Sequence, residues 1–275
     1  MDAFKDSFQK NLPTLIPQVD KGFEPLLSLP FLQSLQSLLA VWGKSIQVHL
    51  PDLRDEASSL ETDAEHAPGF YAQGMGLLFN DAHELSPLLV EWLEQIRRVI
   101  GISALSYRRN LIYATPDGKG TAPHFDQNIN FVLQVKGTKL WKVAPNTHLE
   151  NPLTRHTMGQ PVDPEMMTYL ETPMPTEMPS DAQDFVLKPG SFLYVPRGYW
   201  HSTEAEGDAL ALNFTFTAPT WVDLLTAALR GKLITSPEWR ETADLSEQKF
   251  DQLLGELKLD VHSWRARDIL EATES

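Results

Sequence analysis

The sequence predicts a mainly β protein with helices on both sides of a β-rich centre. Two observations carry this prediction. Apolar residues recur at helical spacing towards both ends of the chain, whereas short apolar runs separated by glycine and proline fill residues 105–219. Short antiparallel strands joined by such turns favour a barrel or a two-sheet architecture. A barrel of this kind can hold a small ligand at its mouth.

Residues 1–104 are predicted to form a helical region with one short strand. A helical stripe combines Phe31, Leu32, Leu35, Leu38, Leu39 and Trp42. Residues 51–69 are acidic and predict a loop, and residues 76–79 predict the strand. A helix then begins at Ser86-Pro87, because Ser is a good N-cap and Pro suits the first helical position. Its apolar face consists of Leu89, Leu93, Ile96, Val99 and Ile100.

Residues 105–219 are predicted to form the β core. Strands are expected at residues 109–113, 128–135, 138–143, 185–187, 191–195 and 209–216. Lys136-Gly137 predicts a hairpin turn between two of them. Residues 144–183 contain seven prolines and show no sustained period. They are therefore predicted to form a long ordered insertion or lid within the core.

Residues 220–275 return to helical patterns and are predicted to form a C-terminal helical region. The clearest patterns cover residues 222–233 and 248–257, with Trp239 and Trp264 as further apolar anchors. No internal repeat is present in the sequence.

Composition excludes several classes of function. The chain has 275 residues with 23 basic and 37 acidic side chains, a net charge of −14, which argues against nucleic-acid and anionic-membrane partners. It has no cysteine, so disulfides, zinc–thiolate sites and thiol nucleophiles are excluded. Met1 to Pro17 lacks the pattern of a secretory signal, and no apolar run reaches membrane-spanning length. A cytoplasmic protein is therefore expected.

A His-X-Asp pair and a distant histidine form a candidate metal site. In a strand, residues two apart face the same side, so His124 and Asp126 can bind one metal, with His201 as the third ligand. Two histidines and one carboxylate form the facial triad of Fe(II) oxygenases. A His-X-Asp pair is common by chance. Taken alone, it is better interpreted as a hydrogen-bonded histidine of the surface or core than as a metal ligand. A solvated polar role is expected for His148 and His156, which lie in the insertion. The remaining histidines have no companion at ligand spacing: His49, His66, His83 and His262.

The sequence around these ligands resembles a known family. Residues 121–141 (TAPHFDQNINFVLQVKGTKLW), 189–201 (PGSFLYVPRGYWH) and 210–214 (LALNF) are similar to the core of JmjC-domain 2-oxoglutarate oxygenases. The resemblance extends over residues 74–220. It is closer to the cupin-like asparaginyl and ribosomal-protein hydroxylases than to the histone demethylases. It implies a double-stranded β-helix, or jelly-roll, with Fe(II) and 2-oxoglutarate as cofactors and O2 as co-substrate.

The resemblance also implies roles for individual residues. The histidines and the aspartate of the triad would hold Fe(II). Lys139 would neutralise the C5 carboxylate of 2-oxoglutarate, although without the family it would be interpreted as a solvated strand lysine. Thr121 would donate its hydroxyl to the same carboxylate. Lys136 and Lys142 are then expected to be surface lysines of the hairpin.

Three further residues are implied as contacts of 2-oxoglutarate. Asn130 and Asn213 would be amide partners of the C1 carboxylate, and Tyr71 would supply another hydroxyl. Asn213 belongs to a strand whose alternate positions are small or polar, which suits a ligand-filled interior. Trp141 and Trp200 are expected to be packing residues.

The function implied is hydroxylation of a peptide or protein side chain. One alternative is a small-molecule hydroxylase acting on an amino acid or a natural product, and another is a non-catalytic cupin that binds a metal. A demethylase would use the same chemistry on a carbon attached to nitrogen. The helices of residues 220–275 would either form a homodimer interface or pack on the β core of the same subunit. No motif specifies the substrate or the hydroxylated position.

Overall fold

The computed structural model describes residues 2–244, 246–267 and 269–270. Residues 271–275 of the predicted C-terminal region lie outside this description. The chain divides into two compact units, one made of residues 1–101 and 107–217 and the other of residues 102–106 and 218–275.

The first unit is built on one large antiparallel sheet. Its strand order is β1-β10-β7-β11-β5-β4-β2-β3, while β6 pairs with β11 and β8, and β9 pairs with β7. The strands are β1 (Thr14–Ile16), β2 (Ile46–His49), β3 (Ser59–Thr62), β4 (Gly76–Asn80), β5 (Tyr107–Thr115), β6 (His124–Phe125), β7 (Ile129–Ala144), β8 (His156–Thr157), β9 (Gln183–Leu187), β10 (Phe192–Val195) and β11 (Trp200–Thr217). This sheet with flanking helices confirms the predicted mainly β fold class.

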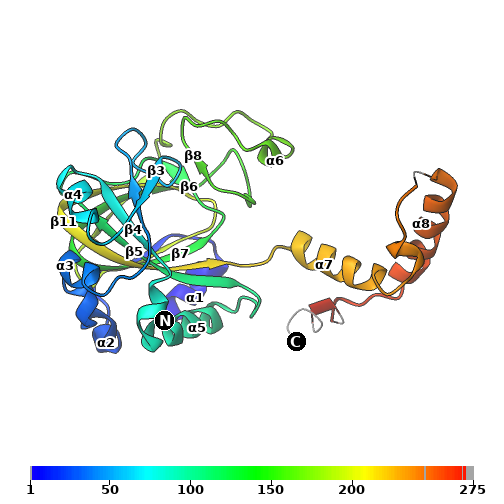
Figure 1. The fold of residues 1–275 in the computed structure, drawn as a ribbon, viewed down its shortest axis with the longest axis horizontal. Coiled ribbons are helices and arrows are strands. Elements are labelled where there is room, and N and C mark those ends of the chain that lie inside the picture. Colours follow the sequence, from blue (N-terminus) through cyan, green and yellow to red (C-terminus); the bar gives the residue numbers. More distant parts are fainter. Residues whose placement is uncertain (1, 245, 268, 271–275) are drawn as a thin grey trace. The chain divides into compact units, whose positions relative to one another are not determined.

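Short helices surround the sheet, and one longer helix covers part of its apolar surface. In the first unit they are α1 (Asp2–Gln9), α2 (Glu24–Leu27), α3 (Leu35–Leu39), α4 (Ala67–Ala72), α5 (Pro87–Ile100) and α6 (Pro164–Met167), with 3-10 turns η1 (Lys21–Phe23), η2 (Pro30–Leu32) and η3 (Ala82–Leu85). Figure 1 shows α1 and α5 together at one end of the sheet, and the segment with β8 and α6 at the other.

Helix α5 forms where the sequence predicts it. Pro87 occupies its first turn, and Gly101 ends it with a positive φ of 74°. Its buried face contains Trp92, whose ring lies 4.4 Å from that of Phe23 and 6.5 Å from that of Phe214 on β11. The helix therefore anchors the central strand from its outer face.

The predicted turn at Lys136-Gly137 is wrong, because β7 runs through it as one strand. Gly137 has a φ of 65°, and a Cβ atom there would lie 2.3 Å from the carbonyl oxygen of Asp208. The partner strand shifts register between Glu206 and Leu210. The glycine thus allows a close approach at a β-bulge and does not reverse the chain.

The N-terminal region contains more strands than predicted. Residues 51–69 are not a simple loop, since β3 and the start of α4 lie within them. The stripe around residues 31–42 is divided into η2 and α3, with Ser34 capping the latter through the amide of Ser37. Strands β2, β3 and β4 extend the sheet beyond β5.

Residues 144–183 form an ordered segment with little regular structure. Strand β8 pairs with β6, so that Thr157 lies opposite His124 and His156 lies opposite Phe125. A small apolar core fixes the segment and consists of Phe125, Ala144, Leu149, Met166 and Trp200. His156 is buried in this region, which contradicts the solvated role expected for it.

The second unit contains α7 (Trp221–Leu233), the 3-10 turn η4 (Glu238–Arg240) and α8 (Glu247–Val261). Thr220 and Asp223 form a capping box at the start of α7, and the rings of Trp239 and Phe250 meet edge to face. Many of its large apolar side chains are exposed, and no residue of α7 is buried. Among the described residues, no helix combines the length and hydropathy needed to cross a membrane.

Candidate active site

The structure brings the three predicted metal ligands together. His201, at the start of β11, lies directly opposite His124 of β6 in the sheet register, and Asp126 follows β6. Each of the three offers a ligand atom within 4.8 Å of the others. Both histidines are buried. The pairing of β6 with β11 is thus what unites residues that are distant in the sequence.

Backbone carbonyls fix the orientation of both imidazole rings. The Nδ1–H of His124 donates to the carbonyl oxygen of Ala122 at 2.8 Å, and that of His201 donates to Tyr199 at 2.9 Å. A carbonyl only accepts, so each Nδ1 carries a proton, which leaves Nε2 as the nitrogen that can bind a metal. Burial, followed by the nearby His124, lowers the pKa of His201 to about 4. The ring of His201 is therefore neutral and able to bind a metal at physiological pH.

Asp126 completes a donor set suited to Fe(II). Burial would raise the pKa of this carboxyl, but the two histidines and Arg155 together lower it to about 2, so it is ionised. Its Oδ2 lies 3.7 Å from Nε2 of His201. Two imidazoles and one carboxylate are borderline and hard ligands, which Fe(II) accepts in a facial arrangement. The residues present fit this metal.

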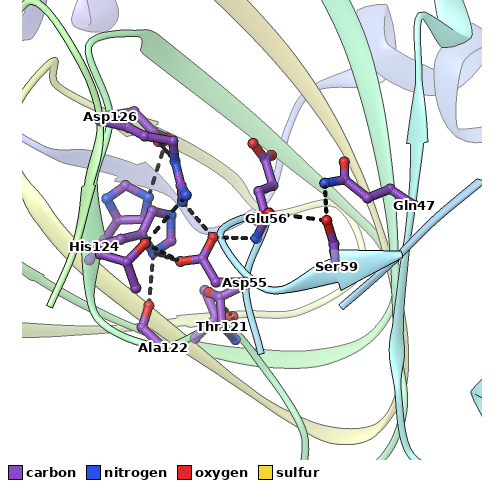
Figure 2. A network of polar contacts seen from close by, with 12 residues as sticks. Gln47, Asp55, Glu56, Ser59, Thr121, Ala122, His124 and Asp126 are labelled. Atoms are coloured by element: carbon purple, nitrogen blue, oxygen red, sulfur yellow. Dashed lines mark hydrogen bonds and ion pairs between the residues drawn. The ribbon is translucent and has the colours of Figure 1, made fainter. Parts of the chain in front are cut away.

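A buried polar network supports the ligands, and Figure 2 shows it reaching from Asp126 and His124 to Asp55. Arg155 contacts Asp55 at 2.5 Å and Asp126 at 3.4 Å. Sequence reasoning missed both Asp55 and Arg155. They lie in segments predicted as a loop and as an irregular insertion, where no periodicity distinguishes a buried charge from a solvated one.

A cavity of about 100 Å³ adjoins the triad, and the predicted residues Thr121, Asn130, Lys139 and Asn213 line it. Lys139 is only 3% exposed, and burial lowers its pKa to about 8. Within the part of the chain that the structure describes, its ammonium has no hydrogen-bond acceptor or carboxylate partner. Its one recorded contact is the ring of Tyr113, 5.7 Å away. A buried cation without an anion is costly, so the pocket fits an anionic ligand.

The two predicted asparagines lie in different environments. Asn130 donates to Oδ2 of Asp126 at 3.0 Å and accepts from the hydroxyl of Thr215 at 2.9 Å, so it also orients the metal ligand. Asn213 carries a buried side-chain oxygen that has no hydrogen-bond partner among the described residues. This second asparagine therefore has an unused polar atom at the cavity.

Thr121 lies at the same cavity beside Thr203. Their hydroxyl oxygens are 2.9 Å apart, and the amide of Thr121 donates to Oγ1 of Thr203 at 3.0 Å. One hydroxyl can donate its hydrogen bond to the other, and the second hydroxyl can then donate to a carboxylate. Thr203 was not foreseen, although it stands two positions after His201 and thus on the same face of β11.

Tyr71 does not reach this cavity. It lines a separate surface cavity with Lys136 and Asp208, and burial together with Asp208 raises the pKa of its hydroxyl. The tyrosine that does line the site is Tyr113, whose hydroxyl donates to Glu56 at 3.4 Å. The alternation of Arg109, Leu111 and Tyr113 along β5, all three lining the cavity, was the signal that could have identified it.

The lysines and tryptophans near the site behave as expected. Lys142 forms an exposed ion pair with Asp184 at 3.0 Å, and Lys136 is exposed. Trp141 and Trp200 are buried, which confirms their packing role. The ring of Trp141 also stacks on that of His201 at 5.7 Å and so limits its movement.

Comparison with known proteins agrees with this architecture. The family model for the JmjC domain matches residues 90–224. Uncharacterized protein YxbC of Bacillus subtilis is 32% identical over 268 residues, which cover 94% of this chain and 81% of YxbC. Ribosomal oxygenase 1 of Rattus norvegicus is 31% identical over 170 residues, 58% of this chain. The alignment spans only 25% of that relative's length.

A solved structure shows the same fold. It is that of YcfD, a ribosomal oxygenase from Escherichia coli, in complex with cobalt and succinic acid. The match has a TM-score of 0.54 at 16% identity and covers 98% of this chain and 68% of YcfD. This similarity confirms the predicted jelly-roll core. With the JmjC profile, the long alignment to YxbC and the shared fold, the chain belongs to the JmjC-domain family.

Proposed function

We propose that this protein is an Fe(II)- and 2-oxoglutarate-dependent oxygenase that hydroxylates a side chain of a peptide or protein. The observation that carries the proposal is the buried ammonium of Lys139, which has no anionic partner among the described residues and shares one cavity with the His-Asp-His ligand set. When bound, Fe(II) with 2-oxoglutarate and O2 supplies the oxidation, with succinate and CO2 as by-products.

The residues of the chain would hold and orient these groups. His124, Asp126 and His201 would bind the metal through two Nε2 atoms and a carboxylate oxygen. The carbonyl hydrogen bonds at both Nδ1 atoms leave the Nε2 atoms for the metal, and burial keeps the ring of His201 neutral. Lys139, with the hydroxyl of Thr121, would bind the distal carboxylate of 2-oxoglutarate by charge-assisted hydrogen bonds.

The remaining predicted contacts divide between ligand and metal. Asn213 has a free side-chain oxygen, so in the ligand complex its amide can turn to donate to the proximal carboxylate. Asn130 already contacts Asp126 and Thr215, which assigns it to orienting the metal ligand. Trp141, packed on His201, helps to exclude water from the site.

A peptide or protein substrate is favoured over a small molecule by the names of the relatives, since ribosomal oxygenases are among them. The cavity of about 100 Å³ beside the ligands has room for a short dicarboxylate.

We further propose that residues 220–275 form a homodimer interface outside a catalytic core of residues 105–219. Three exposed apolar side chains near the start of α7 support this, since Trp221, Val222 and Leu225 are 78%, 63% and 53% exposed. A cytoplasmic location is also proposed, because the chain lacks cysteine and Fe(II) is most readily kept in a reducing compartment.

The function is tested by incubating the protein with Fe(II), 2-oxoglutarate and a panel of peptides and metabolites. We expect slow succinate formation without substrate, and a gain of one oxygen on a peptide in mass spectra. A gain of oxygen on a metabolite alone would indicate a small-molecule hydroxylase. No succinate formation and no binding of 2-oxoglutarate would indicate a metal-binding cupin instead.

A further inference from the structure

Asp55 is a buried carboxylate that belongs to no ligand set. It precedes β3, far upstream of the triad, and is only 1% exposed. A carboxylate this deeply buried has to be paired or hydrogen-bonded. Figure 2 shows it beside His124, with dashed contacts that lead towards Asp126.

The contacts of Asp55 reach two of the metal ligands. Its Oδ2 lies 3.5 Å from Nδ1 of His124 and accepts from the hydroxyl of Thr157 at 3.2 Å. Its Oδ1 accepts from Arg155 at 2.5 Å, and the Nε of the same guanidinium lies 3.4 Å from Oδ1 of Asp126. One ion pair thus touches both ligands of the His-X-Asp motif.

We propose that Asp55 and Arg155 are positioning residues of the metal centre, which hold His124 and Asp126 in their binding orientation. The identity of the metal in this inference rests on the proposed function. The guanidinium holds one oxygen of Asp126, and Asn130 holds the other at 3.0 Å. The orientation of this carboxylate is therefore set from both sides before a metal arrives.

Asp55 has a second, electrostatic part in this arrangement. An unbalanced guanidinium so close to Asp126 would repel a divalent cation. The carboxylate of Asp55 offsets that charge while leaving the hydrogen bond from Arg155 to Asp126 in place. It follows that removing the charge of Asp55 should weaken metal binding more than removing that of Arg155, which is the opposite of what the direct contact with Asp126 suggests.

The test titrates the metal-free chain of 275 residues with Co(II) and records the affinity and the visible absorption spectrum. The variants are Asp55→Asn, Arg155→Gln and the double variant. Asp184→Asn is the control, because it removes an exposed ion pair from Lys142. Changes behind a metal ligand typically reduce affinity about 10- to 100-fold. We expect Asp55→Asn to lose affinity in this range, Arg155→Gln to lose less, both to alter the spectrum, and the control to match the native protein.

Thermal unfolding of the metal-free variants separates positioning from stability. Arg155 has a side chain that is 24% exposed, so Arg155→Gln serves as the folded variant if Asp55→Asn does not fold. Unchanged Co(II) affinity and spectrum in the folded variants would overturn the proposal, as would loss of folding in both. Absence of Co(II) binding by the native protein would instead reject the proposed function together with this inference.

Discussion

At the scale of single residues, the site depends on charges that the fold buries before any ligand is present. Lys139 is buried on β7, where its ammonium lies over the ring of Tyr113 and has no anionic partner among the residues that the structure describes. Asp126, in contrast, has two imidazoles, Arg155 and Asn130 around it. The surroundings of Lys139 can accept an anion, and those of Asp126 can accept a cation.

Replacing Lys139 by methionine tests the first of these arrangements. Charge-assisted hydrogen bonds contribute about 1.5–3 kcal/mol, so Lys139→Met should weaken 2-oxoglutarate binding at least about 10-fold. Co(II) affinity should stay unchanged, and stability should not fall, because a buried unpaired cation is removed. Calorimetric titration measures both affinities, with the exposed Lys142→Met as control. Equal 2-oxoglutarate affinity in Lys139→Met and the native protein would refute this role.

The pH dependence of ligand binding follows from the same residue. Burial lowers the pKa of Lys139 to about 8, so the free protein loses this charge as the pH rises through 8. A dicarboxylate binds the protonated form, and affinity for 2-oxoglutarate should therefore fall with rising pH above that value. Titrations between pH 7 and 9 measure the effect. Lys139→Met provides the comparison, and a parallel fall in that variant would assign the pH dependence to another group.

The residues of the site differ in how far the sequence could predict them. The triad, Lys139, Thr121 and Asn213 stand at the positions expected from the family resemblance, and the structure gathers them around one cavity. Asp55 and Arg155 could not be predicted, because their pairing depends on two segments that meet only in the folded chain. The resemblance implies a contact from Tyr71 as well, but this residue lines a different cavity.

At the scale of elements, the pairing of β7 with β11 positions the site. Strand β11 carries His201 near its start and Asn213 near its end, and β7 carries Asn130 and Lys139 beside it. The sequence predicts most of the residues in β7 but only residues 209–216 of β11. The continuity of β7 could not be predicted, because the local sequence Lys136-Gly137 is also typical of a hairpin turn. Only the bulge in the partner strand shows that the chain continues there.

Gly137 and Gly118 have the same φ of 65°, so a comparison of the two measures what the close approach of β7 and β11 at Gly137 contributes to stability. A Cβ on Gly137 would meet the backbone of Asp208 at 2.3 Å, whereas one on Gly118 would meet nothing within 4 Å. Gly118→Ala should cost about 1–2 kcal/mol for the left-handed backbone alone. Gly137→Ala should cost about 1–3 kcal/mol more, because the strands have to separate. Guanidinium unfolding measures both, and equal losses would show that the approach of the strands is not tight.

At the scale of the whole molecule, the chain has two compact units with different surfaces. The first has an extensive apolar core, while the second leaves many of its large apolar side chains exposed. Among its described residues, Leu253 is the buried hydrophobic one. The helical periodicity of residues 222–233 and 248–257 is predicted from the sequence and confirmed by α7 and α8. The helical periodicity does not specify which surface the apolar faces of these helices contact.

The proposed dimer predicts a particle mass of twice the chain mass of 31.0 kDa. Replacing Trp221 and Leu225 together by glutamate places two charges on the exposed apolar face and should produce monomers that still bind Co(II). Light scattering after size-exclusion chromatography gives the mass. Val186→Glu, on an exposed apolar side chain of β9, is the control. A native mass of one chain would indicate that these helices pack within the subunit.

The central claim is that the triad and the dicarboxylate pocket form one oxygenase site. Succinate formation from 2-oxoglutarate in the presence of Fe(II) and O2 tests it most directly. The native protein should form succinate, whereas His124→Ala and Asp126→Ala should form none because each removes a metal ligand. Succinate formation at an unchanged rate in either variant, or none by the native protein, would contradict the assignment.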